Sequence, residues 1–318
     1  MDKDVKAVDE FVAIYNKFQD EISKVIVGQK RVVKQVLISV FCNGHCLLVG
    51  VPGLAKTLLV QTIAETLGLN FNRIQFTPDL MPSDIVGSEI LTEKRDFKFI
   101  KGPIFSNIIL ADEINRTPPK TQSALLEAMQ ERSITNAGKK YLLDNPFFVL
   151  ATQNPIEQEG TYPLPEAQLD RFMFSVSLDY PSYEEELQIV KQTTVRNNFS
   201  LNKIMNIEDI LKYQELISKL PVTNNVFEYA VNLVAKTRPN SEKSAGIVRD
   251  YIEWGAGPRA SQYLIIAAKC NAAIKGKYSP DIEDVKDVAV PILTHRMVKN
   301  YKAEAEGISI NKIIKEIL

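Results

Sequence analysis

The spacing of hydrophobic residues predicts two helices in the first 43 residues. In the first helix, apolar side chains recur every three or four positions between charged ones, at Phe11, Ile14, Tyr15, Phe18, Ile22 and Val25. This is the period of an amphipathic helix. The segment 26–29, which contains Gly28, interrupts the pattern, and a second helix is predicted over about 30–43.

Short apolar runs then alternate with helical patterns. The strongest runs are almost wholly hydrophobic, as in strands that are buried on both faces. The predicted strands are 46–49, 71–76, 108–112, 147–151 and 172–178, and the predicted helices among them are 54–67, 119–132 and 165–171. We therefore predict an α/β domain, an αβα sandwich around a five-stranded parallel sheet.

Two stretches interrupt this alternation and read as insertions. The first, about 77–105, contains three prolines and two glycines between short β-like pieces. The second, about 133–145, alternates polar and apolar residues around Ala137-Gly138, which predicts a hairpin.

The pattern becomes almost entirely helical after residue 182. Ser182 is followed three residues later by Glu185, the spacing of a capping box at the start of a helix. We therefore predict one α/β domain over 1–182 and a smaller all-helical domain over 183–318.

The composition of the chain excludes several classes of protein. Hydrophobic residues make up 45% of the chain and charged residues 24%, which is typical of globular proteins. The formal charge of −1 provides no basic field for sequence-independent binding of nucleic acid, and no apolar run has the length of a membrane helix. The charged start of the chain has no apolar core behind it and predicts no signal peptide. Three cysteines form no disulfide framework, so we expect a cytoplasmic protein.

The segment between the strand 46–49 and the next helix has the composition of a phosphate-binding loop. It consists of Gly50, Val51, Pro52, Gly53, Leu54, Ala55, Lys56 and Thr57. In this context backbone N–H groups at the helix start would surround the phosphates. Lys56 would neutralise phosphate charge and Thr57 would offer its hydroxyl to Mg²⁺. Ala55 stands where the general pattern has glycine. The alternative, a loop that only turns a strand into a helix, leaves the Pro-Gly and Lys-Thr pairs unexplained.

Polar residues follow two other predicted strands. Asp112 and Glu113 end the run 108–112, and Asn154 follows the run 147–151. Ligands bind at the carboxyl ends of parallel strands. Asp112 would hold Mg²⁺ through water, Glu113 would polarise the attacking water, and Asn154 could orient that water. The alternatives are a loop start that caps the next helix for the two acids, and a turn residue before proline for Asn154.

These motifs together resemble the AAA+ ATPases, and more narrowly the MoxR family. The resemblance rests on the phosphate loop with alanine before its lysine and on the segments 111–120, 151–155, 160–172 and 257–261, which occur in family order. It implies an αβα ATPase domain followed by a helical lid, with ATP or ADP bound between them and against a neighbouring subunit, typically in a hexameric ring.

The resemblance also implies roles for single residues. Asn154 matches the first sensor, Arg259 the second sensor on the lid, and Arg171 the arginine finger that reaches the next subunit. Val27, Gly28 and Gln29 match the segment beside adenine. The insertions 77–105 and 133–145 resemble the helix-2 insert and the hairpin before the first sensor. Family members act as chaperone-like machines that mature or activate partner complexes, often metalloenzymes, and commonly work with proteins that contain a von Willebrand factor A domain.

The arginines have simpler alternatives. Arg171 could pair with Asp170 or Glu166, Arg259 could cap the preceding turn, and Arg116 could neutralise Glu113 instead of adding an interface contact.

Three further features have structural explanations that we favour. Cys42-Asn43-Gly44-His45-Cys46 is too cramped for a zinc site and has no second ligand pair. We expect Trp254 to pack in the lid core and not to stack on a ligand. For His295-Arg296 we favour a packing or surface role over a role at the subunit interface.

The resulting hypothesis is an Mg-dependent ATPase that remodels partner proteins. A nucleotide-gated scaffold with little turnover and a DNA-acting AAA+ enzyme are the alternatives.

Overall fold

The structure is a computed structural model that describes residues 2–157, 160–194 and 200–318. Its residues form two compact units, and neither is one continuous stretch of chain. The first unit comprises residues 1–15, 166–175 and 212–318, and the second comprises 16–165 and 176–211. Segment 166–175 thus belongs to the same unit as the C-terminal helices. A single domain boundary near residue 182 would assign the segment and those helices to different domains. The domain boundary near residue 182 stays a prediction.

A five-stranded parallel sheet organises the second unit, as predicted. Its strands lie in the order β2-β5-β8-β1-β9. Their bounds are β1 Cys46–Val49, β2 Phe71–Gln75, β5 Ile108–Asp112, β8 Phe148–Gln153 and β9 Phe174–Ser177. The pairs β2/β5, β5/β8 and β8/β1 are parallel. Every residue of β5 is buried, which explains why its sequence is a continuous apolar run.

Helices precede and connect the strands of this sheet. They are α2 Lys30–Phe41, α3 Lys56–Leu67, α5 Pro119–Glu131 and α6 Glu166–Leu169, and α1 Asp2–Ser23 precedes them. Helix α3 packs on β2 and β5. Strand β1 leads directly into α3, β8 lies beside β1, and β5 lies beside β8. Because these strands are parallel, the three chain segments that follow them start at the same edge of the sheet.

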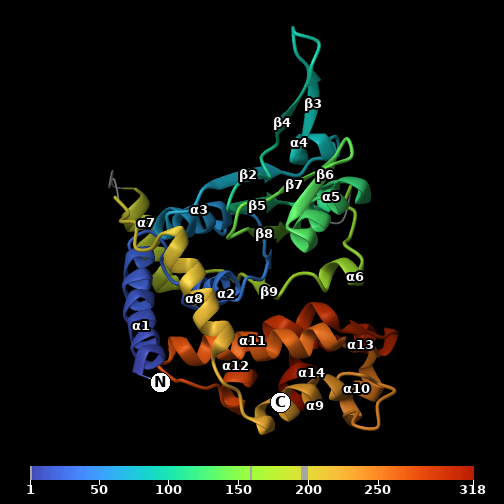
Figure 1. Cartoon of the computed structure of the whole chain (residues 1–318). Helices are drawn as coiled ribbons and strands as arrows, with labels where there is room; N and C mark the ends of the chain where they lie inside the picture. Colours follow the sequence, from blue (N-terminus) through green and yellow to red (C-terminus); the bar gives the residue numbers. More distant parts are fainter. Residues whose placement is uncertain (1, 158–159, 195–199) are drawn as a thin grey trace. The chain divides into compact units, whose positions relative to one another are not determined.

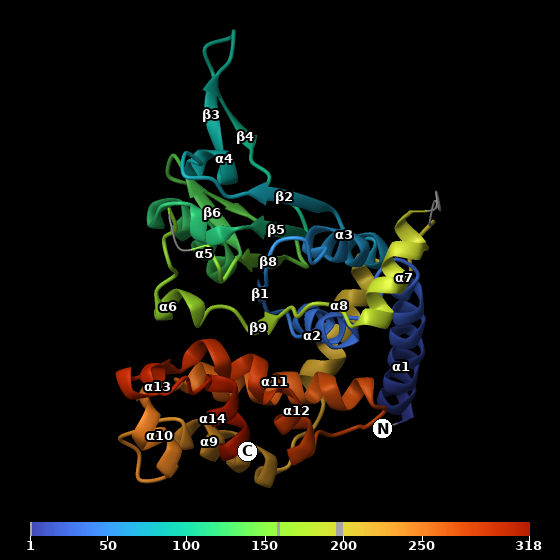
Figure 2. The same cartoon turned by 180° about the vertical axis from the view of Figure 1, so that it is seen from behind.

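Both predicted insertions contain a β-hairpin, which the sequence analysis predicted for the second and not for the first. The first follows the short helix α4 Pro82–Val86 and consists of β3 Gly87–Leu91 and β4 Phe97–Lys101. It projects from the sheet in both views (Figures 1 and 2). The second consists of β6 Ser133–Asn136 and β7 Lys139–Leu142. The rings of Phe99 and Tyr141 stack with their centroids 4.2 Å apart, so the two insertions contact each other.

The predicted capping box is also present. Helix α7 Tyr183–Thr193 begins after Ser182, whose hydroxyl accepts the N–H of Glu185, while the Glu185 carboxylate accepts the N–H of Ser182. This pair supplies acceptors to two of the N–H groups that a helix start leaves open.

The first unit is mostly helical, as predicted, but it also contains a β-ribbon that the sequence did not reveal. Its helices are α9 Asn224–Lys236, α10 Gly246–Tyr251, α11 Pro258–Ile274, α12 Ile282–Leu293, α13 Tyr301–Ala305 and α14 Ile310–Ile317, and α8 Ile207–Lys219 precedes them. The ribbon pairs β10 Ile252–Trp254 with β11 Val298–Lys299 in antiparallel fashion. None of the helices in the described ranges combines the length and apolar composition that a membrane crossing requires.

The expectation that Trp254 packs in the lid core is wrong. Its side chain is 70% exposed, whereas Ile252 on the same strand is buried. Residues two apart on a regular strand share a face, but the register of β10 against β11 shifts between these two residues. A bulge of this kind re-aims the side chain that follows it.

Candidate functional site

The predicted phosphate loop joins β1 to α3 at the edge of the sheet. Ala55 precedes the first residue of α3 and lies in the left-handed region, with φ 53° and ψ 29°. No side chain caps the helix there, so the N–H groups of its first turn, which have no partner within the helix, are open to an anionic ligand. A left-handed backbone explains why glycine is the general residue at this position.

Glycine is needed at two positions of the loop for different structural reasons. A side chain at Gly50 would bring its Cβ to 3.0 Å from Cβ of Leu178, so the strand end is closely packed there. Gly53 has φ +86° with open space around it. The loop is therefore tight at its start and open at its turn, where a ligand can approach the backbone.

Lys56 lies at the first position of α3 with its amine near the carbonyl groups of the loop. Its Nζ donates to O of Gly50 at 2.6 Å. Burial lowers the pKa of Lys56, while the charges of Asp112 and Glu113 raise it. The fold therefore brings the phosphate-loop lysine and the two acids into one electrostatic environment.

The acids at the end of β5 are held by residues that the sequence did not single out. Asp112 accepts hydrogen bonds from Arg73 (Nε at 3.0 Å, Nη2 at 2.6 Å) and from the hydroxyl of Thr152 at 2.6 Å. The N–H of Glu113 donates to the same hydroxyl at 2.8 Å. Thr152 thus fixes both acidic positions. Its place near the end of the strand that neighbours β5 is the signal that could have identified it.

Glu113 has a strained backbone, and one oxygen of its carboxylate accepts hydrogen bonds. It is left-handed, with φ 58° and ψ 50°, which is uncommon for a residue with a side chain. Its Oε2 accepts from Nε2 of Gln75 at 2.7 Å and from Nη1 of Arg116 at 3.2 Å. The alternative for Arg116, neutralising Glu113, is the arrangement that this structure shows.

Asn154 follows β8 directly, and its side chain is used locally. Its Oδ1 accepts the N–H of Ile156 at 3.2 Å, and its Nδ2 lies 3.4 Å from Oε2 of Glu157. The N–H of Gly50 donates to O of Gln153 at 3.1 Å, so Asn154 follows a residue that is bonded to the start of the phosphate loop. The structure therefore shows the turn geometry of the alternative, and the sensor role stays a prediction.

The segment Val27-Gly28-Gln29 links α1 to α2 beside a cavity of about 490 Å³. Val27 and Gly28 line this cavity together with residues of α1, α2 and α7. Gly28 (φ +67°) and Gln29 (φ 52°) both lie in the left-handed region. A side chain at Gly28 would overlap the carboxylate of Glu185, so the capping box of α7 lies against this turn.

The candidate arginine finger Arg171 and the candidate second sensor Arg259 both belong to the first unit. Nη1 of Arg259, near the start of α11, is 2.9 Å from Oδ2 of Asp170, so its side chain forms an ion pair and not the turn cap that was the alternative to the sensor role. Arg171 follows Asp170, and its carbonyl oxygen lies 3.4 Å from the hydroxyl of Tyr263.

We predicted a packing or surface role for Arg296, and in the structure it is the centre of this region. It is buried, and its guanidinium donates to Oδ1 and O of Asp170 and to carbonyls of Phe172, Met173 and Ile292. Arg296 therefore fixes the backbone on both sides of Arg171. His295 also has a packing role, because its Nε2 lies 2.9 Å from O of Phe172.

The comparisons with known proteins agree with this arrangement. The family model for the "ATPase family associated with various cellular activities (AAA)" matches residues 45–174, and the AAA lid domain model matches residues 244–317. The chaperone MoxR1 of Mycobacterium tuberculosis is 44% identical over 94% of this chain and 79% of its own length. The chain belongs to the MoxR family of AAA+ ATPases. The protein MoxR of Paracoccus denitrificans is 28% identical over 91% of this chain and 90% of its own length.

A solved structure supports the same fold for this MoxR family member. It is a crystal structure from Cytophaga hutchinsonii, described as that of a candidate ATPase, with a TM-score of 0.92 and 47% identity. The match covers 98% of this chain and 95% of the other.

The donors around the loop of this AAA+ protein suit a magnesium nucleotide. The uncapped start of α3 and the amine of Lys56 provide positive charge for phosphates, and the Asp112 carboxylate provides the oxygen ligands that Mg²⁺ prefers. Thr57, the second residue of α3, carries the hydroxyl expected to complete this set. Cys42 and Cys46, which we did not expect to hold zinc, are both free thiols and both buried.

Proposed function

We propose that the chain binds ATP with Mg²⁺ and hydrolyses it, and that this turnover drives chaperone-like remodelling of a partner protein complex. The observation that carries the proposal is the cluster formed by Lys56, Asp112 and Glu113 at one sheet edge, with Thr152 hydrogen-bonded to both acidic residues. A phosphate loop alone would support binding; a carboxylate beside it supports a reaction with water.

The chain's own residues would divide the work as follows. The first turn of α3 and Lys56 would hold the phosphates, and Thr57 and Asp112 would hold the metal, which when bound neutralises charge on the phosphate oxygens. Glu113 would accept the proton of the attacking water, and Asn154 would orient that water. For this, Glu113 needs one oxygen available to water. Its contacts with Gln75 and Arg116 both use Oε2, so Oε1 would be the acceptor.

The first experiment measures phosphate release and nucleotide binding in two variants. Glu113→Gln should bind ATP as the native chain does and hydrolyse it about 10² to 10⁴ times more slowly. Lys56→Ala should lose nucleotide binding while its circular dichroism spectrum stays native. Glu127→Gln, an exposed change on α5, is the matched control. Native turnover in Glu113→Gln would remove this residue from catalysis, and negligible native turnover with tight binding would favour a nucleotide-gated scaffold.

The assembly is also part of the proposal. We propose a homo-oligomer, a hexameric ring by family resemblance, in which Arg171 acts on nucleotide held by the next subunit and Arg259 acts as the second sensor. A guanidinium supplied from a neighbour contributes about 10³- to 10⁵-fold in other nucleotide hydrolases. Lys56→Ala and Arg171→Ala should each be nearly inactive alone, and a mixture of exchanging subunits should regain activity. A mixture that exchanges subunits but stays inactive would argue against a shared site.

The cellular role follows from the relatives. One relative is named a chaperone, and we propose the same class of role here, with a client complex and a protein containing a von Willebrand factor A domain as partners. Three free, buried cysteines support our proposal of the cytoplasm as the compartment. Co-purification with Glu113→Gln, which should retain ATP, tests for these partners, and recovery of neither class would contradict this part of the proposal.

A further inference from the structure

A cavity of about 660 Å³ is lined by residues of the first unit. Its walls come from α6, the ribbon β10–β11, and the start of the segment that leads into α11. Its volume lies within the range of about 300–1,000 Å³ that is usual for ligand sites. The small residues Ala167, Gly255 and Gly257 leave the space open.

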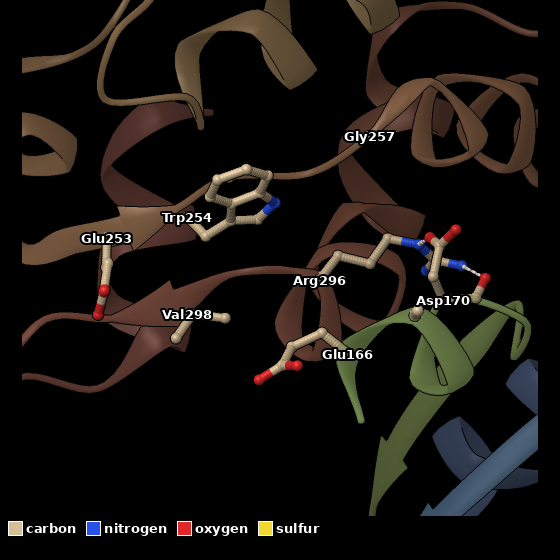
Figure 3. Close-up of a pocket in the computed structure, with 9 residues that line it drawn as sticks. Glu166, Asp170, Glu253, Trp254, Gly257, Arg296 and Val298 are labelled. Carbon is tan, nitrogen blue, oxygen red and sulfur yellow. Dashed lines mark hydrogen bonds and ion pairs between the residues drawn. The ribbon is translucent and has the colours of Figure 1, made fainter. Parts of the chain in front are cut away.

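Trp254 is the aromatic wall of this cavity and is 70% exposed. The backbone at the next residue, Gly255, is closely packed, because a side chain there would overlap the carbonyl of Thr237. Figure 3 shows the indole and Val298 on the ribbon side, with Glu166 projecting from α6 toward the same space. Burying an exposed indole and the apolar side chain beside it against a ligand is favourable in free energy.

The charge of the lining is negative. Glu166, Glu253 and Asp170 contribute carboxylates, and Arg296 contributes the one cation among the residues described as lining the cavity. That guanidinium is fully occupied by Asp170 and the surrounding carbonyls. Within the described part of the chain, the carboxylates of Glu166 and Glu253 have no hydrogen-bond or ion-pair partner. The cavity therefore presents two unpaired negative charges beside an indole.

We propose that this cavity binds an arginine-bearing segment of a partner protein. A guanidinium is planar, stacks on an indole face, and pairs with carboxylates through a fork of N–H donors. Trp254 would supply the stacking surface, and Glu166 and Glu253 would supply the acceptors. A volume of about 660 Å³ exceeds that of one side chain, so residues that flank the arginine would enter as well. The lining includes neither Arg171 nor Arg259, so the proposal does not depend on ATP hydrolysis.

Trp254 makes the test direct, because it is the only tryptophan of the chain. The probe is the peptide acetyl-Gly-Gly-Arg-Gly-Gly-amide, titrated into the full-length protein while Trp254 fluorescence is recorded. The control peptide carries citrulline, which is neutral and of the same shape. We expect a saturable change with the arginine peptide and a much weaker one with citrulline. The absence of a saturable change up to about 1 mM would overturn the proposal.

Variants test the individual walls with a fluorescein-labelled form of the same peptide, followed by anisotropy. Changing Glu166 and Glu253 together to Gln should raise the Kd about three- to tenfold, because exposed ion pairs contribute modestly. Trp254→Ala should weaken binding further. Glu242→Gln and Tyr301→Ala, both exposed and outside the cavity, should leave the Kd unchanged. Equal Kd values in cavity and control variants would overturn the proposal.

Dilution distinguishes the partner from a second copy of the chain. If the emission maximum of the protein alone moves to the blue as its concentration rises, and Glu166→Gln abolishes this shift, the occupant is another subunit and the proposed partner segment is excluded. If emission is independent of protein concentration and the arginine peptide binds, the proposal stands.

Discussion

Replacing Arg296 with methionine should destabilise the lid far more than replacing Arg259, although both arginines pair with the same Asp170. Side-chain exposure separates the two pairs: the Arg296 side chain is 1% exposed and that of Arg259 is 41% exposed. Arg296 uses all five of its N–H donors on Asp170, Phe172, Met173 and Ile292.

The magnitude follows from the acceptors that Arg296→Met would leave behind. The Asp170 carboxylate would keep Arg259, and O of Phe172 would keep its contact with His295. The carbonyls of Asp170 and Met173 would lose their guanidinium donor, and a buried acceptor without a donor costs about 1–3 kcal/mol. We therefore expect a loss of roughly 3–5 kcal/mol in the free energy of unfolding, as for other broken buried pairs. Arg259→Met should cost about 0.2–1 kcal/mol, as for exposed pairs.

Urea unfolding followed by Trp254 fluorescence measures this difference, because Trp254 lies in the same unit as Arg296. With a slope of about 1–3 kcal/mol per molar urea, Arg296→Met should lower the midpoint by at least about 1 M, and Arg259→Met by a few tenths. Similar midpoints for both variants would show that burial of the Arg296 guanidinium does not stabilise this segment. Arg296 fixes the backbone beside Arg171. The folded Arg296→Met variant should therefore also hydrolyse ATP more slowly than the native chain when no urea is present.

Three further predictions concern single backbone or titration effects. Ala55→Gly should raise the free energy of unfolding by up to about 1 kcal/mol, because Ala55 is left-handed; unchanged or lower stability in urea would contradict this. Gly255→Ala should lower the unfolding midpoint and blue- or red-shift Trp254 emission, because the new side chain would overlap the carbonyl of Thr237; native emission and stability would refute it. Burial lowers the pKa of His45 to about 3. As the pH drops, the unfolded chain therefore protonates this histidine before the folded chain does. The free energy of unfolding should fall between about pH 6.5 and pH 3, by at most about 1.4 kcal/mol per pH unit. His45→Gln should reduce that slope in urea titrations at several pH values, and an unchanged slope would exclude His45 as its source.

The amino-acid sequence by itself predicted the sheet, the hairpin of the second insertion and a candidate phosphate loop between β1 and α3. These features depend on local patterns: the apolar run of β5 reflects burial on both faces, and the Pro-Gly and Lys-Thr pairs surround one turn. The capping box of Ser182 and Glu185 was also predictable, since its two partners lie three residues apart. Asp112 and Glu113 could be placed near the loop because parallel strands share one carboxyl edge.

The tertiary structure alone decided which side chains support these positions. Arg73 and Thr152 reach Asp112 from neighbouring strands, 39 and 40 residues away in the chain, and no local pattern encodes such a contact. Arg296 lies 126 residues from Asp170, and its role follows from burial, which sequence spacing does not specify. Trp254 reads as a core residue by type, but a register shift in a three-residue strand exposes it. Local periodicity therefore determined the elements and their order, whereas long-range pairing determined which charges are buried and which side chains remain open to a partner.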